Sequence, residues 1–413
     1  MRHQGRIALA SLCLFFSLQL SFIWMAQKLG GIDFAQFYVA NHTLKEGRGL
    51  YTMNQQQWES QWSKYVDFAP QHGNEPAYIY PPTLAILISP LTTLYWRTDL
   101  LLWRALNVLI FAISASVLSL LLADRLVDPL VFTVAAVWTP SYANLYAGNT
   151  NGLVLLSIVL FLFFASRFRS DAAGLALSAG LAIKPYEAPL LIYLGWRREW
   201  RKLLAVLIGL VVILGIIIAP LNWHNLVEYW RTGAWLSWVA PPLGPAVWFA
   251  HPRIQSFYAF FYRAFTANPY GSSIANSVTV ARLLTLLASS SLLLIIAYLT
   301  WPRREEEPRT FALQVGLVIA AMPLVEAFGE YFHLMVVIVP FLLCWYATAS
   351  RVRRGVLIAA LLLIDVQGVF WSDLVGRTPL LSLGTYGMVL IFCVAASSLH
   401  GLQMTRFVED VGE

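Results

Sequence analysis

The sequence predicts an all-α polytopic membrane protein, and three observations support this prediction. Hydrophobic residues make up 58% of the 413 residues and charged residues only 12%, so the chain has more apolar surface than a water-soluble domain of this size covers. Apolar runs of about 20 residues, the length that crosses a bilayer as a helix, recur along the chain. Lysines and arginines fall in short runs between these stretches, as the positive-inside rule predicts for cytoplasmic loops. These runs explain the net charge of +6 without a nucleic-acid partner.

The apolar runs predict a bundle of about twelve transmembrane helices that forms one membrane domain over residues 1–413. The first run follows a short basic N-terminus, and its length favours a membrane span over a cleavable signal peptide. Both termini are then expected in the cytoplasm. The expected spans cover residues 7–26, 83–96, 100–122, 129–146, 152–165, 172–196, 203–219, 279–301, a run that ends at 326, a run from about 332 to 351, 355–371 and 380–399.

The crossing pattern of the first half has two versions. Simple counting places Arg167 and Arg169 on the external side, which breaks the positive-inside expectation. In the alternative, residues 172–196 form a hairpin of two half-helices broken at Lys184-Pro185, and residues 82–96 dip into the membrane without crossing it. Both versions leave two long external loops, residues 29–80 and 220–277.

The second external loop is rich in aromatic side chains. Five tryptophans in this loop suggest a surface that lies against lipid headgroups or a sugar-bearing ligand. The alternative is that they only anchor the loop at the membrane interface. They are Trp223, Trp230, Trp235, Trp238 and Trp248.

The first external loop places a carboxylate at the start of an amphipathic segment. In residues 30–51, GGIDFAQFYVANHTLKEGRGLY, the aromatic residues Phe34, Phe37 and Tyr38 recur at helical spacing. Asp33 either caps this helix, facing the positive end of its dipole, or has a catalytic role. The local sequence favours neither of these interpretations.

Several polar groups collect at the external ends of the expected spans. Ionisable residues at membrane depth are expensive and generally face a cavity or a partner, so this group outlines a site on the outer face. Three of its members share one face if the segment EAFGEYFH is helical, and a hydrogen-bonded cap between spans is the alternative. The group consists of Asp33, Tyr80, His251, Arg253, Glu326, Glu330 and His333.

Lys184 differs from this group because it lies inside an apolar run. A lysine there either extends to an interface or binds a buried anion such as a lipid phosphate, and the carbonyl freed by Pro185 favours a built site. Asn149 and Asn151 lie in a Gly-Asn-Thr-Asn-Gly segment that is also consistent with an ordinary turn between spans.

These residues together resemble glycosyltransferase family 87. The resemblance runs from about residue 30 to 205 and depends on motif order. Its parts are GGIDFAQFY with a following Gly-Leu-Tyr stretch, Tyr80-Pro81-Pro82 with Pro90-Leu91, Gly148-Asn149-Thr150-Asn151-Gly152, and Ala173-Gly174 with Gly180-Leu181-Ala182-Ile183-Lys184-Pro185. Gln255-Ser256 with Arg263, and His333 near a late outer loop, are similar to further family features.

The resemblance implies an integral-membrane enzyme of the GT-C superfamily. The best-known members are polyprenol-phosphate-mannose-dependent α-mannosyltransferases that act in cell-envelope glycolipid assembly. By this resemblance Asp33 is the catalytic carboxylate, which takes the proton of the acceptor hydroxyl while that oxygen attacks the anomeric carbon with inversion. The residues implied to bind the donor or its departing phosphate are Tyr80, Lys184, Arg253 and His333. The residues implied to contact the acceptor or line the cavity are Tyr38, Asn149, Asn151, His251, Gln255, Glu326 and Glu330.

We therefore expect transfer of a hexose, with mannose as the expected sugar, from a polyprenyl-phosphate donor to a lipid or glycan acceptor. Membrane lipids are expected partners, and the expected location is the bacterial inner membrane with a periplasmic active site. No Asp-x-Asp motif stands in either external loop, which suits a lipid donor without a required metal or cofactor. Two other functions stay open, a lipid-linked glycan flippase and an O-antigen ligase-like enzyme. The ligase would depend on His251 and Arg253 rather than on Asp33.

Overall fold

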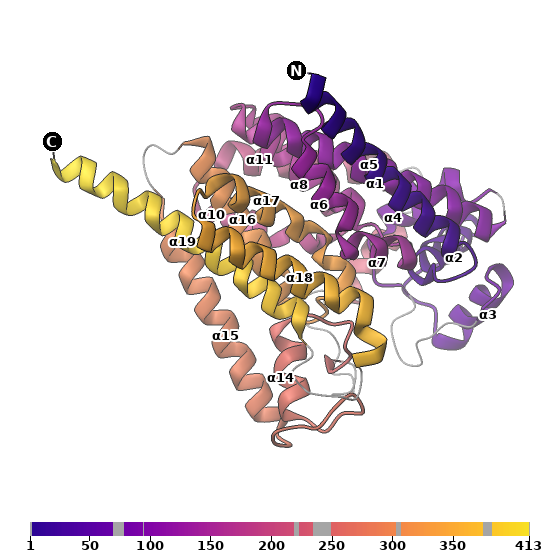
Figure 1. The fold of residues 1–413 in the computed structure, drawn as a ribbon. Helices are drawn as coiled ribbons and strands as arrows, with labels where there is room; N and C mark the ends of the chain where they lie inside the picture. The colour runs from indigo at the N-terminus through magenta and orange to yellow at the C-terminus, as the bar shows by residue number, and fades with distance from the viewer. Residues whose placement is uncertain are drawn as a thin grey trace.

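The computed structural model describes residues 2–68, 78–93, 95–218, 223–233, 249–302, 307–374 and 382–412, and Figure 1 shows that these residues form a helical bundle. No β-strand occurs among them beyond two isolated bridges. The expected all-α class is therefore confirmed. Trp235, Trp238 and Trp248 of the second external loop lie outside the described residues.

The helices of the first half, in chain order, are α1 (Arg2–Met25), α2 (Ile32–Lys45), α3 (Gln55–Tyr65), α4 (Pro82–Leu87), η1 (Ser89–Leu91), α5 (Trp96–Ala123), α6 (Pro129–Val137), α7 (Thr139–Ala147), α8 (Asn151–Ser166), α9 (Ser170–Ile183), η2 (Pro185–Glu187) and α10 (Ala188–Trp196). Those of the second half are α11 (Trp200–Ile218), α12 (Trp223–Arg231), α14 (Phe257–Phe265), α15 (Val278–Leu299), α16 (Pro308–Val325), η4 (Tyr331–Val337), α17 (Ile338–Ala347), α18 (Arg351–Leu374) and α19 (Leu383–Gly412).

Five helices of the described chain are long and apolar enough to cross a membrane. They cover Gln4–Met25, Trp96–Ala123, Val278–Leu299, Pro308–Val325 and Leu383–Leu402. The expected number of about twelve spans is not confirmed, because several expected spans are divided or short.

Two expected spans do not form as continuous helices. Between residue 82 and the start of α5, the described chain has the six-residue helix α4 and the short 3-10 helix η1. A six-residue helix rises about 9 Å where the bilayer core needs about 30 Å. Over 129–146 the chain breaks at Trp138, which has a non-helical φ of −66° and ψ of 93° and precedes the new helix with Pro140 in its first turn. Both breaks coincide with prolines near a helix start, where proline is favoured.

The third break matches the hairpin alternative for residues 172–196. Helix α9 ends at Ile183, Lys184 is extended, and α10 starts again after η2. Gly174 of α9 lies against Ala205 of α11, and Ser178 lies against Gly209, so α9 and α11 run parallel. The chain must therefore return between them, and α10 is the segment that returns.

The small residues at this contact explain the close packing of α9 and α11. A Cβ on Gly174 would collide with the backbone of Lys202, and one on Gly209 would collide with Ser178. Small residues let two helix backbones approach closely in membrane proteins. Arg201 at the start of α11 also pairs with Asp171 at the start of α9 at 2.7 Å. The basic segments near residues 169 and 201 therefore lie at the same end of the bundle.

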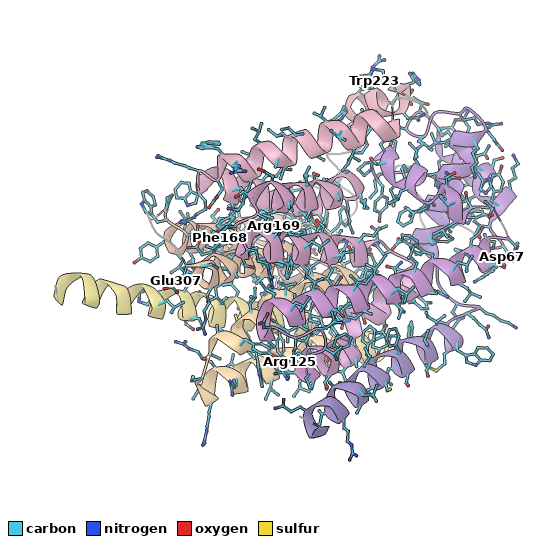
Figure 2. All side chains as sticks on the ribbon, turned by 90° about the horizontal axis from the view of Figure 1, so that it is seen from above. Asp67, Arg125, Phe168, Arg169, Trp223 and Glu307 are labelled. Carbon is cyan, nitrogen blue, oxygen red and sulfur yellow. The ribbon has the colours of Figure 1, made fainter. Side chains whose placement is uncertain are left out.

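Figure 2 shows this division between the two ends. Arg125, Arg169 and Glu307 lie toward one end of the helices, whereas Asp67 lies toward the other. Arg169 thus joins the other loops that were expected on the cytoplasmic side, and the hairpin alternative removes the conflict with the positive-inside rule.

The first external loop folds against the start of α5 around an aromatic core. Trp58 and Trp62 of α3 are buried there with Trp96 and Trp103 of α5. Trp223 and Trp230 of α12 are more than half exposed. The tryptophans of α3 therefore pack the loop rather than offer a surface, whereas Trp223 and Trp230 of α12 are available for lipid or ligand contact.

Two glycines fix the start of α2 against α7. Gly30 and Gly31 have φ values of 66° and 88°, in the left-handed region that glycine adopts without strain. The Gly31 N–H donates to the Tyr146 carbonyl at 2.7 Å. A Cβ on Gly30 would collide with the same carbonyl oxygen.

Gly30→Ala is therefore expected to destabilise the protein by at least about 1–2 kcal/mol, the cost of the left-handed conformation alone. Thermal unfolding of the purified protein checks this, with Gly195→Ala as the control because a Cβ at Gly195 meets nothing within 4 Å. Equal melting temperatures for the two variants would contradict the expectation.

Candidate active site

Asp33 lies in the first turn of α2, but it does not cap the helix. Gly31 holds the N-cap position, with no side-chain cap hydrogen bond. The Asp33 Oδ2 atom accepts a hydrogen bond at 2.8 Å from Nδ2 of Asn149, which lies in the turn between α7 and α8. The Asp33 residue is 8% exposed. The structure therefore directs Asp33 to a tertiary partner instead of its own helix.

The turn after α7 holds Asn149 in a defined orientation. Gly148 ends α7 with a φ of 70° and lies against Phe34, where a Cβ would not fit. The Thr150 N–H donates to Asn149 Oδ1 at 2.6 Å, so the amide nitrogen faces Asp33. The same nitrogen lies 3.4 Å from the Tyr80 hydroxyl. Three residues of the predicted site, Asp33, Tyr80 and Asn149, are thus brought together.

The pKa of Asp33 is raised to about 6, from an ordinary value of 3.8. Burial is the largest cause, because removal from water disfavours the charged carboxylate. The Asn149 hydrogen bond and the positive charges of Lys184 and Arg253 act in the opposite direction. Asp33 lies outside the five candidate spans. At neutral pH the carboxylate is therefore mostly ionised but close enough to its pKa to accept a proton.

Asn149→Ala is expected to raise the pKa of Asp33, since the variant removes a hydrogen bond that favours the ionised form. If ionised Asp33 is needed for activity, wild-type activity falls as the pH drops through about 6, and in the variant this fall occurs at higher pH. A pH profile of kcat/KM checks the shift. An unchanged acid limb would contradict the role given to Asn149.

Asp33 faces a cavity of about 700 Å³, called here the first cavity. Two further charged side chains, Arg253 and Glu330, line it. Its apolar walls come from the last turns of α1 and from α7. Those wall residues include Leu18, Phe22, Met25, Tyr142, Ala143 and Tyr146. Such a cavity suits a ligand with a charged head and a long apolar part.

Backbone pairing between two segments places Arg253 beside Glu330. The Tyr331 N–H donates to the Arg253 carbonyl at 2.7 Å, and the Gln255 N–H donates to the Gly329 carbonyl at 2.6 Å. Arg253 is exposed. A cation and two carboxylates thus share one cavity.

Lys184 belongs to a second polar group, called here the lysine cluster: Asn151, Lys184, His333 and Glu326. Lys184 Nζ donates to Asn151 Oδ1 at 2.9 Å and lies 2.8 Å from His333 Nε2. His333 Nδ1 lies 3.0 Å from Glu326 Oε2. This pattern fits a neutral imidazole that accepts from the ammonium and donates to the carboxylate.

The lysine cluster is buried and does not open directly to the first cavity. Lys184 is 0% exposed and His333 is 4% exposed. Their expected contact with a phosphate stays a prediction, and it requires Lys184 to exchange a present partner. The segment EAFGEYFH is not one helix, since α16 ends at Val325 and η4 begins at Tyr331. Glu326 and His333 nevertheless meet.

Three predicted cavity residues lie outside the first cavity and belong neither to the lysine cluster nor to the hydrogen-bonded group around Asp33. Tyr38 packs against His42 and Tyr65. His251 accepts the Arg253 N–H at 3.1 Å through its Nδ1 atom and lies against Tyr270. None of these side chains lines the first cavity.

Gln255, the third of these residues, joins two segments. Its Nε2 donates to the Pro252 carbonyl, and its Oε1 accepts from the Thr385 backbone N–H at 3.1 Å. Arg263, which the resemblance pairs with it, donates to the carbonyls of His251 and Ile254. Both side chains therefore hold the loop that carries Arg253.

Sequence reasoning missed Arg104, whose hydrogen bonds fix the chain segments next to Asp33. This fully buried side chain of α5 donates to the carbonyls of Ala26, Leu29 and Leu145 at 2.7 Å each. It thereby joins the end of α1 to α7 next to Asp33. The signal was an arginine inside an apolar run, the same signal that singled out Lys184.

A hydrogen-bonded group at the far wall of the first cavity was also missed. Asp365 of α18 accepts from the backbone N–H and the hydroxyl of Thr139 at 3.0 and 2.8 Å. The Tyr331 hydroxyl lies against the Thr139 hydroxyl and donates to the Ile364 carbonyl. These contacts fix the start of α7 against α18. Within the described ranges no group of three His, Cys, Asp or Glu side chains is placed to hold a metal ion.

Comparison with known proteins gives relatives that act on sugars. An alpha-(1->3)-arabinofuranosyltransferase of Mycobacterium tuberculosis is 27% identical over 252 residues, which cover 58% of this chain and 54% of the relative. The Mycolicibacterium smegmatis protein of the same name is 27% identical over 294 residues, covering 68% and 62%. A polyprenol-phosphate-mannose-dependent alpha-(1-2)-phosphatidylinositol mannoside mannosyltransferase of M. tuberculosis is 30% identical over 170 residues, covering 37% and 39%.

The chain spans about half the length of these curated relatives. The profile of glycosyltransferase family 87 matches residues 78–326, which is more than half of the 413 residues. The matched range includes Tyr80, Asn149, Lys184 and Arg253, so it carries most of the side chains around Asp33. The chain belongs to glycosyltransferase family 87.

Proposed function

We propose that this protein transfers a glycosyl group from a polyprenyl-phosphate donor to a hydroxyl of a lipid or glycan acceptor, with Asp33 as the base. The observation that carries the proposal is the first cavity, in which Asp33 and Arg253 face one space with long apolar walls. A polyprenyl phosphate has a long apolar chain and an anionic head, and the cavity offers a matching wall and cation.

The proposed step is a single displacement. Asp33 takes the proton of the acceptor hydroxyl as its oxygen forms a bond to the anomeric carbon. The bond between that carbon and the phosphate oxygen breaks, and its electron pair leaves with the polyprenyl phosphate. Attack opposite the leaving group inverts the configuration of the anomeric carbon.

Arg253 is proposed to stabilise the departing phosphate. Charge-assisted hydrogen bonds from arginine to phosphate are strong, and they strengthen as negative charge develops on the leaving oxygen. Lys184 contributes positive charge from the lysine cluster, since it acts on Asp33 through space. Asn149 holds the reacting carboxylate in place through its amide nitrogen.

The sugar is proposed to be either mannose or an arabinofuranose. The sequence suggested mannose, and the mannosyltransferase relative supports a polyprenyl-phosphate donor. The arabinofuranosyltransferase relatives support the second candidate over a longer part of this chain. The proposed location is the bacterial inner membrane, with the first cavity on the external face.

A donor panel tests this function. Membranes carrying the full chain are incubated with radiolabelled polyprenyl-phosphate mannose, glucose and arabinofuranose, and labelled lipid and glycan products are measured. Transfer from one donor, absent from membranes without the protein, is the expected result. No transfer from any donor with endogenous acceptors present would favour the flippase or ligase functions.

A further inference from the structure

A second cavity of about 590 Å³ is lined by Glu326 of the lysine cluster. Helices α10, α11, α12 and α16 contribute its walls, which are mostly apolar. The apolar lining includes Pro185, Ile192, Leu210, Leu214, Leu226 and Trp230. Its size and composition suit a lipid chain.

Two side chains that line the second cavity have unpaired polar atoms. The hydroxyls of Thr83 and Tyr186 are buried and have no hydrogen-bond partner, and such atoms cost about 1–3 kcal/mol each when they stay unpaired. Glu326 also lines the cavity, and its carboxylate has acceptor sites beyond the one that bonds His333. The two hydroxyls are closed off from the cavity in this conformation, so a ligand that carries hydroxyls would pair with them after a side-chain rotation, whereas it meets Glu326 as a lining carboxylate.

The two cavities differ in the cation that they offer. Arg253 lines the first cavity beside the carboxylates of Asp33 and Glu330, whereas the described lining of the second contains the carboxylate of Glu326 and no lysine or arginine. An anion beside a carboxylate needs a compensating cation. A phosphate-bearing lipid therefore has a cationic partner in the lining of the first cavity and none in the described lining of the second.

From these observations we infer that the second cavity binds an uncharged, hydroxyl-bearing lipid, which is the acceptor. The inference rests on the proposed function. The acceptor's chain lies between α10, α11 and α16, and its hydroxyls bond Tyr186 and Glu326. For the reacting hydroxyl to reach Asp33, the buried side chains of the lysine cluster must move aside, because they do not open to the first cavity. Donor and acceptor chains thus occupy separate cavities on opposite sides of the reacting groups.

Photoaffinity labelling of the full chain in lipid nanodiscs tests this assignment without any need for turnover. One probe is dodecyl mannoside with a diazirine in its alkyl chain, and the other is farnesyl phosphate with a diazirine in its prenyl chain. The mannoside is expected to label peptides of α10 and α11. The phosphate probe is expected to label α1 and α7.

Leu210→Trp fills the second cavity, and Val211→Trp on the same helix is the matched control, because Val211 is 70% exposed and does not line the cavity. Leu210→Trp is expected to lower mannoside labelling about tenfold, in line with the cost of overfilling a packed site, and to leave phosphate labelling unchanged. Val211→Trp is expected to change neither.

The inference is overturned if the phosphate probe labels α10 and α11, if the mannoside labels only α1 and α7, or if both tryptophan variants behave alike. Transfer in the donor panel combined with any of these results would reject the acceptor site and keep the function. The expected labelling without transfer from any donor would reject the proposed function and leave the second cavity as a lipid site.

Discussion

Asp33→Asn is expected to lower the rate of glycosyl transfer by about 10²- to 10⁴-fold, the range typical for loss of a general base. The amide is nearly isosteric with the carboxylate but does not accept the hydroxyl proton. The buried site keeps its shape, so folding and donor binding are expected to persist. The measurement is the transfer rate of purified protein with the donor that the panel identifies, together with the melting temperature.

The control for this experiment is Asp67→Asn in the same external loop. Asp67 pairs with Arg97 at 2.9 Å, and its side chain is 44% exposed. Exposed ion pairs contribute little to stability, so this variant is expected to transfer at nearly the wild-type rate. Wild-type transfer by Asp33→Asn would remove the catalytic role from Asp33.

Lys184→Met is expected to reduce transfer by about tenfold or more, because it removes a charge-assisted hydrogen-bond donor worth about 1.5–3 kcal/mol. It also removes a positive charge that lowers the pKa of Asp33. If the ammonium serves the departing phosphate, the KM for the donor rises more than the KM for the acceptor. Separate KM measurements for the two substrates check this difference.

Lys202→Met is the matched control, since Lys202 is another largely buried lysine. It lies in the first turn of α11 and pairs at 2.6 Å with Glu199, which precedes that helix. It is expected to leave both KM values unchanged. Equal increases in donor and acceptor KM for Lys184→Met, with a lower melting temperature, would assign Lys184 a folding role only.

Local signals in the sequence predicted the helical class and the segment that carries Asp33. Apolar content and the spacing of aromatic residues act over one helix, so they are readable without tertiary information. The break at Lys184-Pro185 was predicted as an alternative because simple counting of spans placed Arg167 and Arg169 outside, against the positive-inside rule. The choice between a hairpin and a span needed the parallel packing of α9 and α11, which depends on distant residues.

The positions of individual site residues were less predictable. Asp33, Tyr80 and Asn149, to which the resemblance gave separate roles, lie together in the structure, whereas Gln255 bonds Pro252 and Thr385 and does not line the first cavity. A glutamine that bonds a ligand and one that joins two backbones have the same sequence context. Only the position of the partner elements separates these two roles.

The contact between Glu326 and His333 shows the same limit in another form. Helical spacing suggested that they share a face, and they do approach to 3.0 Å. The chain between them is a turn followed by a short extended stretch that pairs with Ile254. The right contact thus arises from a backbone path that periodicity does not describe.

The most direct test of the account is a cryo-EM structure of the full chain with a non-reactive polyprenyl phosphonate of the identified sugar. We expect the phosphonate beside Arg253, the anomeric carbon facing Asp33 and the prenyl chain along α1 and α7. A phosphonate in the second cavity, or an anomeric carbon remote from Asp33, would contradict the account.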